Sequence, residues 1–228
     1  PNSRKLIVTE SLFSMDGDEA PLGNIVNLAE KYGAMVMVDE AHATGVYEPN
    51  GAGLIAKLAI GDRVLIQMGT LGKALGGFGA YIAGSKALRE LLINRCRSFI
   101  FTTSLPPAVM AMAIAAIDLV KKEPERRQIL RNNCERLRSG LKECGYRLGN
   151  SQSQILPLLV GDATQCMKLS ERLLQDGIFA QGIRPPTVPE GTSRLRITLM
   201  ATHTREHIDQ ALRVFKEVAW DMRMEDGR

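Results

Sequence analysis

Short apolar runs alternate with helical stretches in the first half of the chain, and this alternation constrains the fold more than any other feature. Four runs are typical of strands, at residues 5–10, 35–38, 64–68 and 80–83. The second is apolar throughout, as in a strand buried on both faces of a parallel sheet. Between the first two runs, residues 21–32 have helical periodicity that places on one face Leu22, Ile25, Leu28 and Ala29. Strands separated by helices predict an α/β fold with a parallel or mixed sheet.

A charged stretch at residues 121–127 marks the expected domain boundary, because boundaries fall in polar linkers. The segments before it predict two helices, at residues 85–98 and 106–122. After it we expect a helix to about residue 144, strands at 154–160, 179–183 and 194–199, and helices at 163–176 and 204–220. The pattern therefore predicts one domain over residues 1–124 and a smaller α+β domain over residues 125–228.

Charge and composition exclude several classes of partner. The 29 basic and 25 acidic residues leave a net charge of +4 without a basic block, and aromatic residues make up 5%. We therefore expect neither nucleic acid nor a membrane surface as a partner. Four cysteines stand far apart with no C-x-x-C pair, which favours free thiols in the cytoplasm.

The chain opens directly into an apolar strand. Residues 1–5, Pro-Asn-Ser-Arg-Lys, lead without any turn or helix into the run Leu-Ile-Val. We interpret the sequence as a fragment or a processed form of a longer protein.

Polar residues that carry chemistry follow three of the predicted strands. These are Ser14, the segment Asp39-Glu40-Ala41-His42, and the glycine-bracketed loop at residues 69–77. Open α/β sheets bind their ligands just beyond the carboxyl ends of their strands.

Asp39 closes the most apolar strand, so its carboxylate is expected to be partly desolvated and to need a cation. A protonated pyridine nitrogen would be such a partner, as in pyridoxal-phosphate enzymes. The alternative is that Asp39 caps the turn that follows it.

Lys73 lies between glycines, which let the backbone approach a ligand closely. A lysine in an apolar pocket loses its charge readily and becomes an amine nucleophile. Two alternatives stay open: an ordinary loop lysine, and a phosphate-binding lysine without covalent chemistry, although the P-loop spacing is absent.

Taken together, these segments resemble one family. Val38-Asp39-Glu40-Ala41-His42-Ala43-Thr44-Gly45, followed by Thr70-Leu71-Gly72-Lys73, is similar to the α-oxoamine synthases, and the resemblance extends over residues 5–220. It implies the C-terminal part of the fold-type-I (class II aminotransferase-like) pyridoxal-phosphate transferase fold. Residues 1–124 would be the remainder of the large α/β domain that binds pyridoxal 5'-phosphate, and residues 125–228 the small C-terminal domain.

The resemblance also implies roles for individual residues. Lys73 would hold the cofactor covalently and move protons, Asp39 would pair with the pyridinium nitrogen, and His42 would bind the 3-oxygen of the ring. Four further residues match cofactor contacts, with the last two reaching the neighbouring subunit of a homodimer: Ser14, Thr70, Thr102 and Thr103. Two match substrate contacts: Arg196, for the substrate carboxylate, and Thr187.

The reaction implied is the condensation of an amino acid with an acyl thioester, carried by coenzyme A or acyl carrier protein, with loss of carbon dioxide. Residues 183–192 and 194–196 are most similar to family members that use L-alanine and a pimeloyl thioester in biotin biosynthesis. Glycine C-acetyltransferase and other members of the family are the enzymatic alternatives. An alternative of a different class is a truncated, non-catalytic subunit that needs a partner chain.

His203-Thr204-Arg205-Glu206-His207 fits the H-x-x-E-H pattern of a zinc protease class. The segment starts a predicted helix, where a threonine can cap the first amides, and no third ligand is in evidence. We therefore expect no metal site there.

Overall fold

The structure is a computed structural model that describes residues 3–47 and 50–225, with side chains described to residue 219. The interpretation of the sequence as a fragment is based on residues 1–5, of which Pro1 and Asn2 lie outside the described residues. The chain forms two compact units. The first unit comprises residues up to Phe13 together with Glu19–Pro124, and the second comprises Ser14–Asp18 together with the residues from Glu125 onward.

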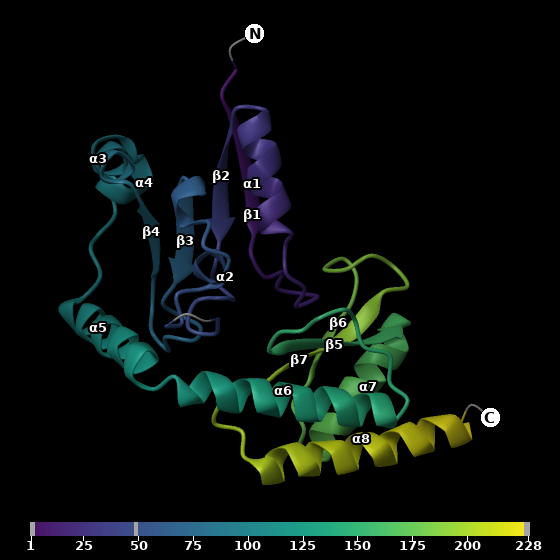
Figure 1. Cartoon of the computed structure of the whole chain (residues 1–228). Helices are drawn as coiled ribbons and strands as arrows, with labels where there is room; N and C mark the ends of the chain where they lie inside the picture. The colour runs from purple at the N-terminus through teal and green to yellow at the C-terminus, as the bar shows by residue number, and fades with distance from the viewer. Residues whose placement is uncertain (1–2, 48–49, 226–228) are drawn as a thin grey trace. The chain divides into compact units, whose positions relative to one another are not determined.

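The first unit contains a four-stranded sheet in the order β1-β2-β3-β4, formed by Lys5–Glu10, Ala34–Asp39, Ile66–Thr70 and Ala80–Gly84 (Figure 1). The strands β1, β2 and β3 are parallel, whereas β4 pairs with β3 in the antiparallel direction. The sheet is therefore mixed, as predicted. Its helices are α1 (Leu22–Lys31), α2 (Leu54–Lys57), α3 (Lys86–Arg95), α4 (Arg97–Ile100) and α5 (Pro107–Lys122).

Helix α1 packs against one face of this sheet. Val36 and Val38 of β2 lie in a buried cluster with side chains of α1: Leu22, Val26 and Ala29. The other face of β2 is open in the part of the chain that the structure describes, where Met35 is 37% exposed. The expectation of burial on both faces of β2 is therefore wrong for the described residues. Leu28, which the periodicity placed on the same face of the helix as Leu22, is 53% exposed, whereas Leu22 is buried.

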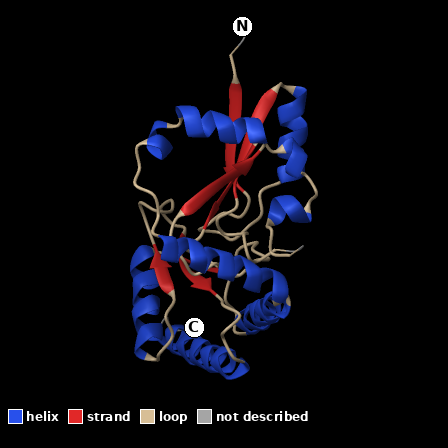
Figure 2. Ribbon diagram, turned by 90° about the vertical axis from the view of Figure 1, so that its left-hand side faces the viewer, coloured by secondary structure: helices blue, strands red, loops and turns tan. Residues whose placement is uncertain are grey.

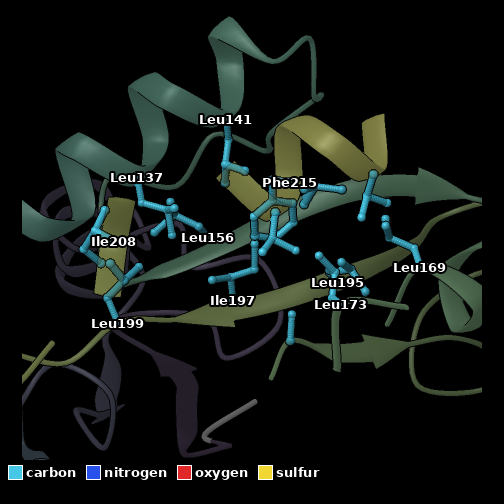
Figure 3. Packing of buried hydrophobic residues seen from close by; sticks show 14 of the residues in the cluster. Leu137, Leu141, Leu156, Leu169, Leu173, Leu195, Ile197, Leu199, Ile208 and Phe215 are labelled. Carbon is cyan, nitrogen blue, oxygen red and sulfur yellow. The ribbon is translucent and has the colours of Figure 1, made fainter. Parts of the chain in front are cut away.

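The second unit contains an antiparallel sheet in the order β5-β7-β6, formed by Ile155–Gly161, Ser193–Thr198 and Gln181–Ile183. Its helices are α6 (Glu125–Glu143), α7 (Ala163–Gln175) and α8 (Arg205–Glu225). Figure 2 shows these strands in red beside helices in blue. In Figure 3, Leu137 and Leu141 of α6 point toward the sheet. Phe215 of α8 is fully buried in the same cluster.

Several local features differ from the sequence-based expectation. Strand β3 starts two residues later than expected, at Ile66. The helix expected over residues 85–98 is interrupted at Cys96, whose backbone is extended, so it divides into α3 and α4. The four-residue helix α2 was not predicted, because an element this short shows no periodicity.

Among residues 3–47 and 50–225, no helix combines the length and the apolar character that crossing a membrane would require. All four cysteines are free thiols, as expected.

Candidate functional site

The parallel strands of the first unit end side by side. Glu10, the last residue of β1, is in register with Asp39, the last residue of β2, and Asp39 is in register with Met68 of β3. The segments that follow Asp39 and Thr70 therefore leave the sheet at the same edge, where ligands bind in open α/β sheets.

At this edge the side chains of Lys73 and His42 meet. The Nζ atom of Lys73 lies 2.9 Å from Nε2 of His42, although the residues come from different loops. A lysine ammonium donates hydrogen bonds, so the imidazole nitrogen acts as the acceptor when the lysine is charged. The two residues that the sequence assigned to the chemistry are thus brought into direct contact.

Buried apolar side chains stabilise the loop around Lys73. Leu71 and Leu75 are buried in a cluster with Ala113 of α5. The Gly76 amide donates to the carbonyl oxygen of Lys73 at 2.9 Å, and Gly76 has a φ of +64°, which favours glycine. Lys73 itself is exposed within the described part of the chain, so the apolar pocket expected around its amine is not found there.

Asp39 is half-buried and already accepts one hydrogen bond. Its Oδ1 atom lies 2.7 Å from the amide nitrogen of Ala41, which donates to it. The capping of the following turn, which the sequence left open as an alternative, is therefore present. A carboxylate has a second oxygen for a cation, so capping and pairing with a pyridinium are compatible.

Thr70 closes the other end of the same loop. Its hydroxyl donates to the carbonyl oxygen of Gly79 at 3.1 Å and accepts from the amide of Gly72 at 3.2 Å. These bonds shape the loop that presents Lys73, and the phosphate contact predicted for Thr70 stays a prediction.

Ser14 and Arg196 come together in the second unit. Nε of Arg196 donates to the carbonyl oxygen of Ser14 at 2.6 Å, and Nη1 donates to the hydroxyl of Thr198 at 3.1 Å. Burial lowers the pKa of the Arg196 guanidinium from its ordinary value. Arginine keeps its charge in proteins all the same, so the group remains a cation for a carboxylate.

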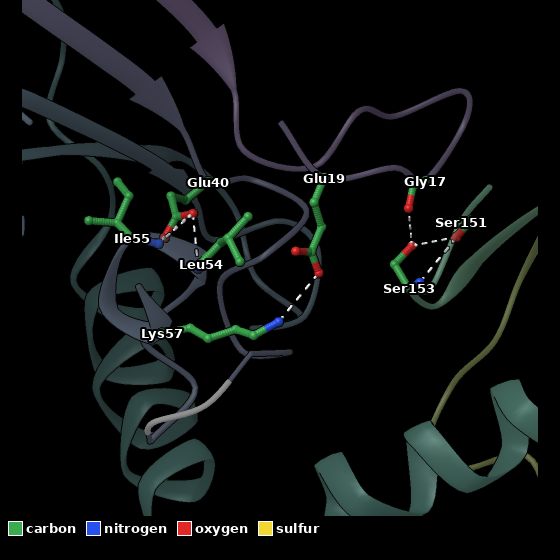
Figure 4. Close-up of polar contacts among 8 residues, drawn as sticks. All are labelled: Gly17, Glu19, Glu40, Leu54, Ile55, Lys57, Ser151 and Ser153. Atoms are coloured by element: carbon green, nitrogen blue, oxygen red, sulfur yellow. Dashed lines mark hydrogen bonds and ion pairs between the residues drawn. The ribbon is translucent and has the colours of Figure 1, made fainter. Parts of the chain in front are cut away.

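Two further contacts hold the segment Ser14–Asp18 to the second unit. Asp16 forms an ion pair with Arg194, whose side chain is 8% exposed. The hydroxyl of Ser153 donates to the carbonyl oxygen of Gly17 at 2.8 Å (Figure 4). The expected domain boundary placed Ser14 in the first domain, whereas the structure places it in the second unit. Sequence patterns miss this because the acceptors on Ser14 and Gly17 are backbone carbonyls.

The remaining predicted site residues lie in exposed loops. Thr102 and Thr103 follow α4 in the first unit. Thr187 lies in the second unit, in a turn where its amide donates to the carbonyl oxygen of Arg184 at 3.1 Å. The structure thus groups Lys73, His42, Asp39 and Thr70 at one sheet edge, and assigns Ser14, Arg196 and Thr187 to the other unit.

Glu40 was not singled out from the sequence, yet it is 4% exposed. Its Oε1 atom accepts from the amide of Leu54 at 3.0 Å, and Oε2 lies 3.3 Å from the amide of Ile55 (Figure 4). Burial raises the pKa of the Glu40 carboxyl above its ordinary value. Strand alternation was an available signal, because Glu40 continues the buried positions Val36 and Val38.

His203 and His207 have local structural roles. The Nδ1 atom of His203 accepts from the amide of Met200, and that of His207 from the amide of Thr204, each at 3.2 Å. The Thr204 hydroxyl accepts from the amide of His207 at 3.3 Å and caps the start of α8. Within the described ranges, no three His, Cys, Asp or Glu residues are grouped in a way that could hold a metal ion.

The residues at the edge of the first sheet fit pyridoxal phosphate. Covalent attachment needs a primary amine beside a hydrogen-bonding group, and Lys73 contacts His42 in this way. An electron-sink ring needs an anionic partner for its nitrogen, and Asp39 ends the neighbouring strand at the same edge.

Known proteins resemble the chain over nearly its whole length. The family model described as aminotransferase class I and II matches residues 1–215. The 8-amino-7-oxononanoate synthase of Geotalea daltonii is 51% identical over 219 residues, which cover 95% of this chain and 56% of that protein. The enzyme of the same name from Geobacter sulfurreducens is 50% identical over 221 residues, with coverages of 96% and 56%. The chain therefore spans about half the length of the curated relatives it matches.

Solved structures also resemble the chain over nearly its whole length. The serine palmitoyltransferase of Sphingomonas wittichii has a TM-score of 0.93 and 35% identity, covering 96% of this chain and 56% of that one. A structure described as SPT with its PLP internal aldimine has a TM-score of 0.92 and 36% identity, with the same coverages. The 8-amino-7-oxononanoate synthase of Francisella tularensis has a TM-score of 0.84 and 28% identity, covering 97% of this chain and 65% of that one.

Proposed function

Because the chain belongs to the aminotransferase class I and II family, we propose that the complete protein is a pyridoxal-phosphate-dependent acyltransferase. It condenses an amino acid with an acyl thioester and releases carbon dioxide. The observation that carries this proposal is the contact between Lys73 and His42 at the strand edge that Asp39 also occupies. An amine, an imidazole and a carboxylate in this arrangement match the attachment, orientation and charge pairing that the cofactor needs.

The roles of the residues follow from their chemistry. The amine of Lys73 holds the cofactor covalently, and it later moves a proton at the α-carbon of the substrate. Asp39 keeps a positive charge on the ring nitrogen, and His42 orients the ring through its 3-oxygen. When bound, pyridoxal phosphate supplies the electron sink for a carbanion at the α-carbon.

We assign to the other predicted residues the binding and orientation of the cofactor and the substrate. Hydroxyl groups suit phosphate and cofactor contacts, and we assign these to Ser14, Thr70, Thr102 and Thr103. Arg196 holds the substrate carboxylate, for which a planar guanidinium is suited, and Thr187 lies against the substrate. The bonds to Ser14 and Thr198 use Nε and Nη1 of Arg196. Nη2 is therefore the nitrogen that we assign to the carboxylate.

For the substrates, we propose L-alanine and a pimeloyl thioester, whose condensation is a step of biotin biosynthesis. Curated relatives named 8-amino-7-oxononanoate synthase, which are 50–51% identical to this chain over the matched residues, support that choice. The high TM-scores with serine palmitoyltransferase favour a second candidate, in which a longer acyl thioester is joined to serine.

We further propose that residues 1–124 are the remainder of the large domain and that residues 125–228 are the small domain. The enzyme would work as a cytoplasmic homodimer whose sites use Thr102 and Thr103 of the partner.

The test is covalent labelling of the complete polypeptide. Pyridoxal phosphate is added, the absorbance band of the lysine-bound cofactor is recorded, and borohydride reduction with peptide mapping locates the label. The proposal expects the label on Lys73 and its loss in Lys73→Ala, whereas Lys86→Ala, which removes another exposed lysine, keeps it. A label on another lysine, or none, would refute the assignment. Turnover of alanine and serine with short and long acyl thioesters then separates the two candidate reactions.

A further inference from the structure

The buried carboxylate of Glu40 connects two segments that lie far apart in the sequence. It receives the amides of Leu54 and Ile55 at the start of α2, which are 14 and 15 residues away. The side chain is 4% exposed, so these amides replace the water that a carboxylate would otherwise need. Figure 4 shows the carboxylate directed at both residues.

The backbone of Glu40 holds the turn that carries His42. Its amide donates to the carbonyl oxygen of Met68 in β3 at 2.8 Å. Its carbonyl oxygen accepts from the amides of Ala43 and Thr44 at 2.9 and 2.8 Å, and from the Thr44 hydroxyl at 3.0 Å. His42 thus lies in a turn that begins at Glu40 and is closed by the bonds from Ala43 and Thr44 to the carbonyl oxygen of Glu40.

Gly53 shows how closely the carboxylate lies against the backbone. A Cβ atom added to Gly53 would overlap Oε2 of Glu40. Gly53 also has a φ of +109°, in the region that favours glycine, so both space and conformation require this residue. The segment before α2 is therefore fitted to the Glu40 side chain.

We propose that Glu40 is a positioning residue: by fixing the start of α2 to the turn at residues 40–44, it holds His42 against Lys73. It acts through His42 and does not touch the cofactor. The inference rests on the proposed function only for its effect on cofactor binding.

The role differs from space filling, and two substitutions separate the possibilities. Glu40→Met keeps the length of the side chain but leaves the amides of Leu54 and Ile55 without their acceptor, which loosens the turn. Glu40→Gln keeps one oxygen in place of the two. A positioning role therefore predicts a graded effect in which Glu40→Gln rescues part of what Glu40→Met loses, whereas a space-filling role predicts that both variants resemble the wild type.

The first measurement needs no cofactor. The chain of 228 residues has three histidines, His42, His203 and His207, so their ring resonances can be followed by nuclear magnetic resonance and His42 identified by its loss in His42→Asn. In Glu40→Met the His42 resonance is expected to shift and broaden, with Glu40→Gln intermediate, while the other two histidines stay unchanged. The exposed Glu171, changed to methionine or glutamine, is the matched control and is expected to leave all three resonances unchanged. An unchanged His42 resonance in both Glu40 variants would overturn the proposal, and Glu40→Gln alone decides it when Glu40→Met does not fold.

The second measurement is the concentration of pyridoxal phosphate at half-saturation, followed by the absorbance band. Misplacement of a group in an active site by about 1 Å can lower the rate of a reaction roughly a hundredfold. Because cofactor binding depends on the same placement, Glu40→Met is expected to raise the half-saturating concentration of pyridoxal phosphate by about tenfold or more. An unchanged value in Glu40→Met, in a wild type that binds, would contradict the role of Glu40 at the site. A wild type that binds no cofactor would refute the proposed function instead, and the histidine resonances would still judge whether Glu40 positions His42.

Discussion

The Nζ atom of Lys73 lies 2.9 Å from the Nε2 atom of His42, across 31 positions of sequence. This contact predicts that His42→Ala weakens cofactor binding although Lys73 is intact, because the amine loses the group that orients it. We expect the pyridoxal phosphate concentration at half-saturation to rise by roughly tenfold, measured by absorbance titration. His207→Ala, in α8, is the control and should leave the titration unchanged; equal titrations for His42→Ala and the wild type would contradict the prediction.

Gly17 is expected to tolerate no side chain. It has a φ of +65°, and a Cβ atom added there would overlap the carbonyl oxygen of Ile155. Gly33 has a similar φ of +60° but open space around it. Gly33→Ala therefore carries only the conformational cost, about 1–2 kcal/mol. Gly17→Ala adds overlap with neighbouring atoms and should lower the free energy of unfolding by about 1–3 kcal/mol more, as measured by urea unfolding. Equal losses would contradict the overlap.

Asp16→Asn removes the ionic partner of Arg194, which is almost fully buried. Loss of one partner leaves an uncompensated charge, but Asp16 itself is half-exposed, so we expect a loss of about 1–3 kcal/mol in the free energy of unfolding. Asp118→Asn is the control, because its carboxylate and Lys122 are both exposed and 3.8 Å apart. Asp118→Asn should change the free energy of unfolding by no more than about 0.5 kcal/mol. A loss as small as in this control would show that Asp16 does not stabilise Arg194.

Phe215→Ala should be among the most destabilising single changes in the second unit. Phe215 is fully buried, and its ring makes an edge-to-face contact with Tyr146 at 5.5 Å between centroids. The cavity left by a buried phenylalanine costs about 3–5 kcal/mol. Phe179→Ala is matched in chemistry but removes a side chain that is 77% exposed, and should change stability by about 0.5 kcal/mol or less. Denaturant titration of both variants tests the difference, which would vanish if Phe215 were not part of the core.

The cysteines should react with alkylating agents in an order set by their pKa values. A hydrogen bond with Ser98, followed by the backbone at Phe99, lowers the pKa of the Cys96 thiol from its ordinary 9.0. Burial raises the pKa of Cys134 to about 11. Because the thiolate is the reactive form, Cys96 reaches half its maximal rate at a lower pH than an ordinary thiol, while Cys134 stays protonated.

Mass spectrometry after brief iodoacetamide treatment near neutral pH should therefore find Cys96 modified and Cys134 unmodified. Ser98→Ala should move the pH dependence of Cys96 upward. A faster reaction at Cys134 in the folded protein would contradict the assignment.

The regular elements of the fold could be predicted because their signal is local. The strand over residues 5–10 has the expected bounds, and α5 begins one residue after the expected start. Helix α2 could not be predicted, since its first amides are satisfied by Glu40, whose position relative to α2 only the fold determines. The exposure of Met35 was equally beyond the sequence, because an apolar run does not tell how many faces of a strand are covered.

The candidate site, too, could be predicted from the sequence only in part. The family resemblance pointed to both Lys73 and His42, and the strand ends explained why their loops share an edge. The bond from Arg196 to the carbonyl oxygen of Ser14 left no trace in the sequence, because every residue carries such an acceptor. The roles assigned to these residues stay predictions that the labelling and titration experiments test.

The segment Ser14–Asp18 has a consequence for the order of folding. Its contact between Gly17 and Ser153 closes across 136 positions, so the second unit cannot reach its final form from its own continuous sequence alone. Contacts this distant in sequence slow folding, because the loop must be closed before the contact stabilises anything. During synthesis the segment would leave the ribosome early and wait until β5 and β7 had followed. A polypeptide starting at Glu125 would lack Asp16, the partner of Arg194, and should fold to a looser state than the same residues preceded by residues 1–124.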